Sequence, residues 1–380
     1  MPTTRASEKN AAAKEGSSGT IEEKGAGSKH EIQDKASPKA KRPKKTDDKK
    51  QQTIEDTLPS ATEAAEEPNE EQKLSEDEPN DVQDQTQKTE TAEEPGAREG
   101  EVPSSILEKG IIYFFFRGRV GIDDPSDVSE IQRSFMVLRP LDKDAKLGAG
   151  TIEDASNIRL IAVPKKVFPR SGRDRWIAFV EKSDASLKTL REEFLSSSDY
   201  ETKTAGTRHT PAATPAAEGV YAITTTGRAS HLAYVLTLPS ELGEVQAELG
   251  LREKGSFIIS TRNPQYDAPR GTALPSGPDY PKEVLDEFRA LRWIPSRPRH
   301  LDFVNTQFLL VGESSGIAKA TEPQREDEEE GKEKPGEELE LLEDEDARRM
   351  EALREDDSEA IFADLGTLAK GYPDLKTTFE

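Results

Sequence analysis

Two arginines, Arg117 and Arg119, end the most apolar stretch of the chain, GIIYFFFRGRV at residues 110–120. Side chains of a strand alternate between its two faces, so this spacing puts both guanidinium groups on one face, roughly 6–7 Å apart. Further basic residues stand at the ends of other expected strands: Arg139, Lys165, Lys166, Arg173 and Arg175. If these ends converge, the seven side chains form a basic rim that would bind phosphate or an acidic peptide. The alternative is that the strand ends reach water, with arginine stems covering apolar edges.

No motif in the chain specifies a reaction. The sequence contains no cysteine, which excludes disulfides, thiolate metal sites and cysteine nucleophiles. The four histidines form no close pair and stand at His30, His209, His231 and His300. We therefore expect no metal site, no cofactor and no catalytic residue that can be named. An enzyme or small-ligand-binding domain is not excluded, but nothing specific in the sequence supports one.

A compact basic cluster, KRPKK, occupies residues 41–45 and contains Lys41, Arg42, Lys44 and Lys45. A short flexible run of lysine and arginine can lie extended in an acidic groove of an import receptor. The cluster therefore predicts a nuclear protein with a nuclear import receptor among its partners. The alternative is a lysine-rich tail without a specific function.

Charge divides the 380-residue chain into three parts. Residues 1–100 contain 16 basic and 24 acidic residues, residues 101–315 contain 28 and 29, and residues 316–380 contain 9 and 22. With only 32% hydrophobic residues and a net charge of −22, the chain has too few apolar residues to order its whole length. We predict a disordered tail over residues 1–105 and a folded domain over 106–315. An acidic low-complexity segment would follow over 316–357, and a short amphipathic C-terminal helix or tail over 358–380.

The same composition predicts the compartment. The N-terminal residues lack the apolar run of a secretory signal, and no apolar stretch approaches the roughly 20 residues of a membrane helix. We therefore expect an intracellular protein without a membrane partner.

The folded domain is predicted to be α+β and dominated by strands. Three segments have the apolar spacing of short amphipathic helices, at residues 185–195, 240–249 and 281–291. The apolar runs predict eight strands, at residues 111–117, 134–139, 158–163, 175–181, 219–224, 231–238, 256–261 and 307–311. Near-continuous apolar strands indicate that both faces of the sheet are covered. A barrel-like sheet and a sheet in two halves both satisfy this pattern.

Near the C-terminus, Ile361, Phe362, Leu365 and Leu368 fall at helical spacing behind the acidic segment. This arrangement is typical of a segment that folds in the groove of a partner, and we predict such a partner helix here. Docking on the chain's own domain and a frayed tail are the alternatives. The long acidic spacer permits either kind of docking.

The central block also resembles a family of fungal proteins that are commonly labelled BTB-domain transcription factors. The resemblance rests on KGIIYFFFRGRV, RSFMVLRP, RLIAVPKKVFP, RWIAFVEK, EGVYAI, HLAYVLTLP, GEVQAELGLREKGSFIIS and FLLVGES, and it spans residues 107–314. It implies a nuclear location and a regulatory role. It assigns no functional residue.

Three functions follow from these observations. The first is a nuclear regulatory protein that acts in transcription or chromatin through protein partners, which the acidic tails would favour if those partners are basic and histone-like. The second is nucleic-acid binding through the basic rim, which the net charge of −22 disfavours. The third is an enzyme or small-ligand-binding domain of unspecified chemistry.

Overall fold

The computed structural model describes residues 93–203 and 206–379. The basic cluster at 41–45 and most of the predicted N-terminal tail lie outside these residues. All eight predicted strands are present, and each is as long as its apolar run or longer. They are β2 (Ile106–Gly118), β3 (Ile131–Leu141), β5 (Ile158–Val163), β6 (Arg175–Ala185), β9 (Ala213–Thr225), β10 (Ser230–Leu238), β11 (Lys254–Arg262) and β13 (Gln307–Gly312).

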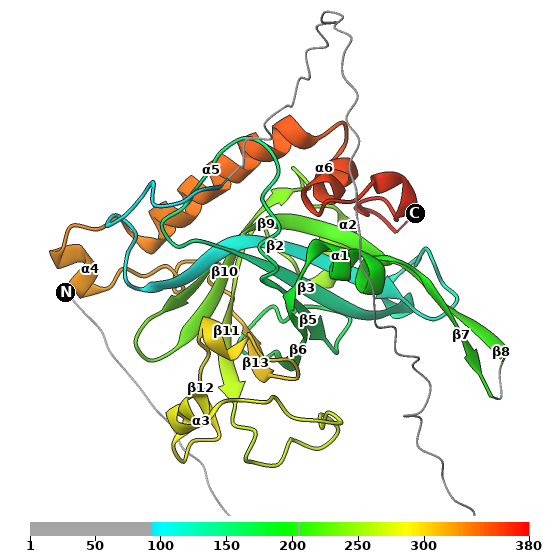
Figure 1. Cartoon of the computed structure of the whole chain (residues 1–380), viewed down its shortest axis with the longest axis horizontal. Helices are drawn as coiled ribbons and strands as arrows, with labels where there is room; N and C mark the ends of the chain where they lie inside the picture. The colour runs from blue at the N-terminus through cyan, green and yellow to red at the C-terminus, as the bar shows by residue number, and fades with distance from the viewer. Residues whose placement is uncertain (1–92, 204–205, 380) are drawn as a thin grey trace, which may run out of the picture. The chain divides into compact units, whose positions relative to one another are not determined.

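These eight strands form a closed antiparallel barrel (Figure 1). Around the barrel the order is β2, β3, β5, β6, β13, β11, β10 and β9, which pairs again with β2. The first four strands follow one another along the chain, and the last four return in the opposite direction to close on β6 and β2. The prediction of a strand-dominated α+β fold with a barrel-like sheet is thus confirmed, and both halves of the sheet belong to one barrel.

The barrel interior is filled by side chains. The even-numbered residues of β2, Ile112, Phe114 and Phe116, point inward and are fully buried. The ring of Phe114 meets Phe168 and Tyr234 edge-to-face at centroid distances of 5.2 and 5.1 Å. Such contacts pack the interior as densely as an ordinary core, so the barrel resembles the small barrels whose interior is occupied by their own side chains.

The other face of β2 is buried as well, but against helices. Ile111, Tyr113 and Phe115 point outward and belong to a second apolar cluster. This cluster joins the barrel wall to α1 (Leu187–Leu190), the π-helical turn Arg191–Leu195, α5 (Pro335–Leu353) and α6 (Asp357–Asp364). Both faces of β2 are therefore covered, as its near-continuous apolar run predicted.

The remaining elements surround the barrel. The second and third predicted helices correspond to α2 (Glu244–Leu249) and α3 (Lys282–Phe288), and α4 (Arg325–Glu329) precedes α5. Short strand pairs join β1 (Glu93–Glu94) to β4 (Lys146–Leu147) and β7 (Ser198–Thr202) to β8 (Gly206–Thr210). The strand β12 (Trp293–Pro295) extends one edge of β11.

Two predictions for the C-terminal part are wrong. The folded region does not end at 315, because the described residues, 93–203 and 206–379, belong to one compact unit and the acidic segment folds into helices on the barrel wall (Figure 1). The predicted partner helix is also docked on its own chain. Ile361, Phe362 and Leu365 are fully buried in the outer cluster, whereas Leu368 is 83% exposed. The three apolar side chains therefore complete the core and are not free to bind a partner.

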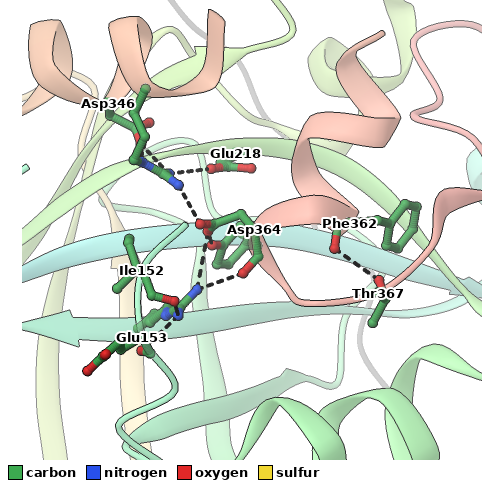
Figure 2. Close-up of polar contacts among 10 residues, drawn as sticks. Ile152, Glu153, Glu218, Asp346, Phe362, Asp364 and Thr367 are labelled. Atoms are coloured by element: carbon green, nitrogen blue, oxygen red, sulfur yellow. Dashed lines mark hydrogen bonds and ion pairs between the residues drawn. The ribbon is translucent and has the colours of Figure 1, made fainter. Parts of the chain in front are cut away.

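A buried network of ion pairs fixes α5 and α6 to the barrel (Figure 2). Arg349 of α5 contacts Glu218 of β9 at 3.2 Å, Asp346 of its own helix at 2.5 Å, and Asp364 of α6. Arg139 of β3 reaches the same Asp364 carboxylate at 3.3 Å. Each of these side chains is fully or almost fully buried. Removing one partner from such a network leaves an uncompensated buried charge.

The numbers of positive and negative groups in this network are nearly balanced. Two guanidinium groups face three carboxylates, and burial together with the nearby Asp346 raises the pKa of Glu218 well above its usual value. Burial likewise raises the pKa of Asp364, to about 8. Burial also lowers the pKa of Arg139 to about 10, which still leaves this arginine charged at neutral pH.

A second network ties the N-terminal half of α5 to the barrel. Glu338 accepts hydrogen bonds from Lys109 of β2 at 2.7 Å and from Arg98 at 2.9 Å. Arg98 also contacts Glu345, whose other oxygen accepts from the backbone N–H of Leu147 at 3.0 Å. The acidic residues on the buried side of α5 thus neutralise cations of the barrel and of the segment before it.

The four residues of the predicted partner helix provide the first test. We expect Phe362→Ala to lower the free energy of unfolding by about 3–5 kcal/mol, because it deletes a buried ring from the outer cluster. Leu368→Ala, in the same segment but exposed, should change it by less than about 0.5 kcal/mol. Urea denaturation of both variants measures the difference. Equal, small effects would contradict the docking of α6.

Adjacent arginines of α5 provide a second, matched test. Arg349→Met should cost about 3–5 kcal/mol of unfolding free energy, because Glu218, Asp346 and Asp364 lose their shared cation. The neighbouring Arg348 is exposed, and Arg348→Met should be close to neutral. Thermal and urea unfolding of the two single variants compares them directly. If both variants unfold as the wild type does, the network does not hold the helices.

Candidate functional site

The strand register decides which residues of the predicted basic rim lie together. β3 runs antiparallel to β2, so Arg139 pairs with Ile111 at one end of the barrel, while Arg117 pairs with Arg133 at the other. β5 and β6 continue this alternation, with Ser134 opposite Val163. Residues just after β5 and at the start of β6 therefore lie at the same end as Arg117, and Arg139 does not.

Two arginines of the predicted rim are occupied by the fold itself. Arg139 is buried in the network described above, so its assignment to a surface rim is wrong. Arg117 is half-buried: its guanidinium donates to the carbonyl of Phe194 and lies 5.5 and 5.3 Å from the ring centroids of Phe135 and Phe194. For Arg117 the alternative of an arginine covering an apolar edge describes the structure better.

The remaining five basic residues are spread over the surface. Arg119 and Arg173 are exposed and line neither of the two cavities considered below. Lys166 is half-buried and donates to the carbonyl of Ser129. Lys165 and Arg175 alone share a cavity.

This cavity is a groove of about 600 Å³ on the outer wall of the barrel. We call it the outer groove, and define it by its lining residues: Arg133, Pro164, Lys165, Arg175, Trp176, Ile177, Phe179, Gly271, Thr272, Ala273, Leu274 and Gln307. Three consecutive positions on one face of β6, Arg175, Ile177 and Phe179, lie along it. The loop Gly271–Leu274 forms its other side, and Gln307 of β13 holds that loop by donating to the Thr272 carbonyl at 2.5 Å.

The groove exists because the helices cover only part of the barrel. Outward side chains of β2 and β3 are buried under α5, α6 and the π-helical turn. On β6 and β13, by contrast, outward Ile177, Phe179 and Leu309 remain half-buried. The uncovered wall therefore keeps an apolar floor in contact with solvent.

The electrostatics of the outer groove differ from those of the whole chain. Its lining contains three basic and no acidic residues, although the chain carries a net charge of −22. Arg133 is ion-paired with Glu181 at 3.9 Å, a distance beyond that of a hydrogen bond, so its N–H groups can still donate to a ligand. Lys165 lies 5.5 Å from the centroid of the Trp176 ring. The Trp176 Nε1–H is buried and has no hydrogen-bond acceptor among the described residues.

A larger cavity of about 1030 Å³ lies between the β9–β10 turn and the α3 region. Its lining contains three acidic and three basic residues. Of these, Glu287 contacts Arg297 at 3.7 Å and Arg299, and it lies 3.3 Å from the buried His300. Burial opposes ionisation of Glu287, but the hydrogen bonds from Arg299 and His300 lower its pKa overall. Because its acidic and basic residues are equal in number, this cavity presents less net charge to a ligand than the outer groove does.

The sequence identified Lys165 and Arg175 as candidate site residues, but it did not identify the other residues that line the outer groove. Arg133 directly precedes the strand predicted at 134–139, and Trp176 and Phe179 stand in an apolar run that predicted a buried strand. The signal that could have revealed them is the alternation within RWIAFV, which puts Trp176, Ala178 and Val180 on one face and Arg175, Ile177 and Phe179 on the other. Only the barrel shows that the second face is left uncovered.

The comparisons leave the chain without a relative of known function: no family model, no curated protein and no solved structure matches it. Within residues 93–203 and 206–379, no group of histidine, aspartate or glutamate side chains is arranged to hold a metal ion. No helix in this same part of the chain combines the length and hydropathy needed to span a membrane.

Proposed function

We propose that this chain is a nuclear regulatory protein that acts in transcription or chromatin by binding protein partners, and that the outer groove is one of its binding surfaces. The observation that carries the proposal is the groove itself. It combines a solvent-accessible apolar floor with basic residues at its margin. Apolar surface enclosed by polar residues is typical of interaction sites.

The barrel interior supports a binding role over an enzymatic one. Buried aromatic and branched side chains occupy it and contact one another across it. A rigid, filled barrel can instead hold an outer surface in a fixed shape. The nuclear location rests on Lys41, Arg42, Lys44 and Lys45 and on the resemblance to the fungal family.

Nucleic-acid binding is the second candidate and would use the same groove. Three cations and a partly buried tryptophan in one groove resemble the composition of single-strand binding sites. The strongly negative net charge opposes it at long range. We therefore place protein partners first.

The nuclear location can be tested on its own. Replacing Lys41, Arg42, Lys44 and Lys45 together with alanine should shift a fluorescently tagged full-length protein from the nucleus to the cytoplasm, because the import receptor loses its basic ligand. Substituting the nearby Lys49 and Lys50 in the same way is the control and should leave the distribution unchanged. Nuclear accumulation of the first variant would show that the cluster is only a solvated tail.

The groove can be tested by proximity labelling of the full-length protein in cells. In the double variant Lys165→Glu and Arg175→Glu we expect a subset of labelled proteins to fall at least about tenfold, the change that about 1.4 kcal/mol of binding free energy produces. The double variant Arg119→Glu and Arg173→Glu makes the same charge change outside the groove, on residues that are equally exposed. It should retain the full set of labelled proteins.

Both double variants alter exposed side chains, so each should keep the stability of the wild type, which thermal unfolding checks. Identical labelled sets for the wild type and both variants would contradict the proposal that the groove binds partners.

A further inference from the structure

We infer that the outer groove binds a short acidic linear peptide, anchored by one apolar or aromatic side chain. This inference rests on the proposed function and specifies the partner's chemistry. It follows from three features of the groove: its size, its charge and an unsatisfied donor on one of its lining residues.

The size suits a peptide segment. A volume of about 600 Å³ lies within the range of about 300–1,000 Å³ that encloses small ligands and individual side chains. The loop Gly271–Leu274 stands on one side of the floor and is held there by Gln307. A chain lying along β6 would place one large side chain over Ile177 and Phe179.

The charge selects an acidic sequence. Arg133, Lys165 and Arg175 flank the apolar floor. Arg133 is ion-paired with Glu181 at 3.9 Å, whereas Lys165 and Arg175 have no carboxylate partner among the described residues. Carboxylates next to the anchoring residue would form charge-assisted hydrogen bonds with these cations, and the planar guanidinium groups could bind them bidentately. A basic or neutral peptide would leave Lys165 and Arg175 unpaired.

One lining residue carries an unsatisfied donor. The Trp176 Nε1–H is buried without an acceptor in the described part of the chain. A buried donor without a partner is unfavourable, so a ligand acceptor that reached it would be stabilised. A peptide carbonyl can supply that acceptor.

The barrel wall already binds one acidic segment. On its covered side, the carboxylates of Glu338 and Asp364 pair with Lys109 and Arg139, and neighbouring Leu339 and Ile361 fill the apolar surface between them. The outer groove presents the same combination of cations and apolar side chains, without an occupant from the described residues. An acidic peptide with an apolar anchor would reproduce on this side what α5 and α6 do on the other.

Panning a phage-displayed random peptide library on the full-length protein tests the inference. The wild type and the Lys165→Glu/Arg175→Glu variant are panned in parallel, and sequences enriched only on the wild type are read. We expect these sequences to carry clustered aspartate and glutamate around one phenylalanine, tryptophan or leucine. Neutral or basic groove-dependent sequences would overturn the inference, as would the absence of any groove-dependent sequence.

Direct binding of a synthetic consensus peptide gives the second readout. Its affinity by fluorescence polarisation should fall at least tenfold in the groove variant and stay within twofold in Arg119→Glu/Arg173→Glu. Replacing the acids of the peptide with their amides should weaken binding at least tenfold. In a Trp293→Phe background, Trp176 is the only tryptophan, and its fluorescence should shift on binding. An unchanged spectrum would place the peptide elsewhere and overturn the inference.

The outcomes separate this inference from the proposed function. If proximity labelling depends on the groove but acidic peptides do not bind, the function stands and the partner chemistry is wrong. If a single-stranded oligothymidylate binds the groove and displaces the peptide with higher affinity, the groove is a nucleic-acid site and the inference fails. If labelling is unaffected but acidic peptides bind with the expected dependence, the chemistry is right and the cellular role is wrong.

Discussion

The buried contact between Arg349 and three carboxylates determines the rest of this structure. One guanidinium joins α5 to β9 through Glu218 and to α6 through Asp364. Because Arg139 meets the same Asp364 from β3, the two C-terminal helices are fixed at one position on the barrel wall. Ion pairs that are this deeply buried gain little over apolar packing, but they are costly to break or to shift. They therefore specify where the acidic helices lie, while Ile361, Phe362 and Leu365 supply the burial of apolar surface.

The eight strands could be predicted from the sequence because the apolar pattern that marks each strand is local. Apolar runs bounded by glycine, proline and aspartate marked all eight strands, and the run at 111–117 showed that two faces had to be covered. Closure could not be derived, because strand order is a matter of contacts between distant residues. The pairing of β9 with β2, for example, joins residues about a hundred positions apart. Composition alone gave no information about it.

The predictions for the acidic C-terminal segment and for the basic rim were wrong for physical reasons. In α5 the acidic residues Glu338, Glu345 and Asp346 are buried with partners far away in the sequence, while sequence reasoning treats acids as solvated. The sequence does contain a signal for a buried helix face, because five residues of α5 share one side of the helix: Leu339, Leu342, Asp346, Arg349 and Met350. The rim failed at Arg139 because antiparallel neighbours end at opposite ends of a barrel. Two residues that each stand at the C-terminal end of a strand can therefore lie at opposite ends of the barrel.

The helices α5 and α6 also determine which cations of the outer barrel wall are neutralised. On the covered side, Lys109 and Arg139 meet carboxylates from α5 and α6, so the acidic C-terminal region neutralises cations that would otherwise be buried unpaired. On the open side, Arg175 and Lys165 keep their charge toward solvent beside an apolar floor. The network at Arg349 connects these helices to the covered side of the barrel. A chain with a net charge of −22 thus retains a local basic groove, because the buried acids of α5 and α6 are held elsewhere on the same barrel.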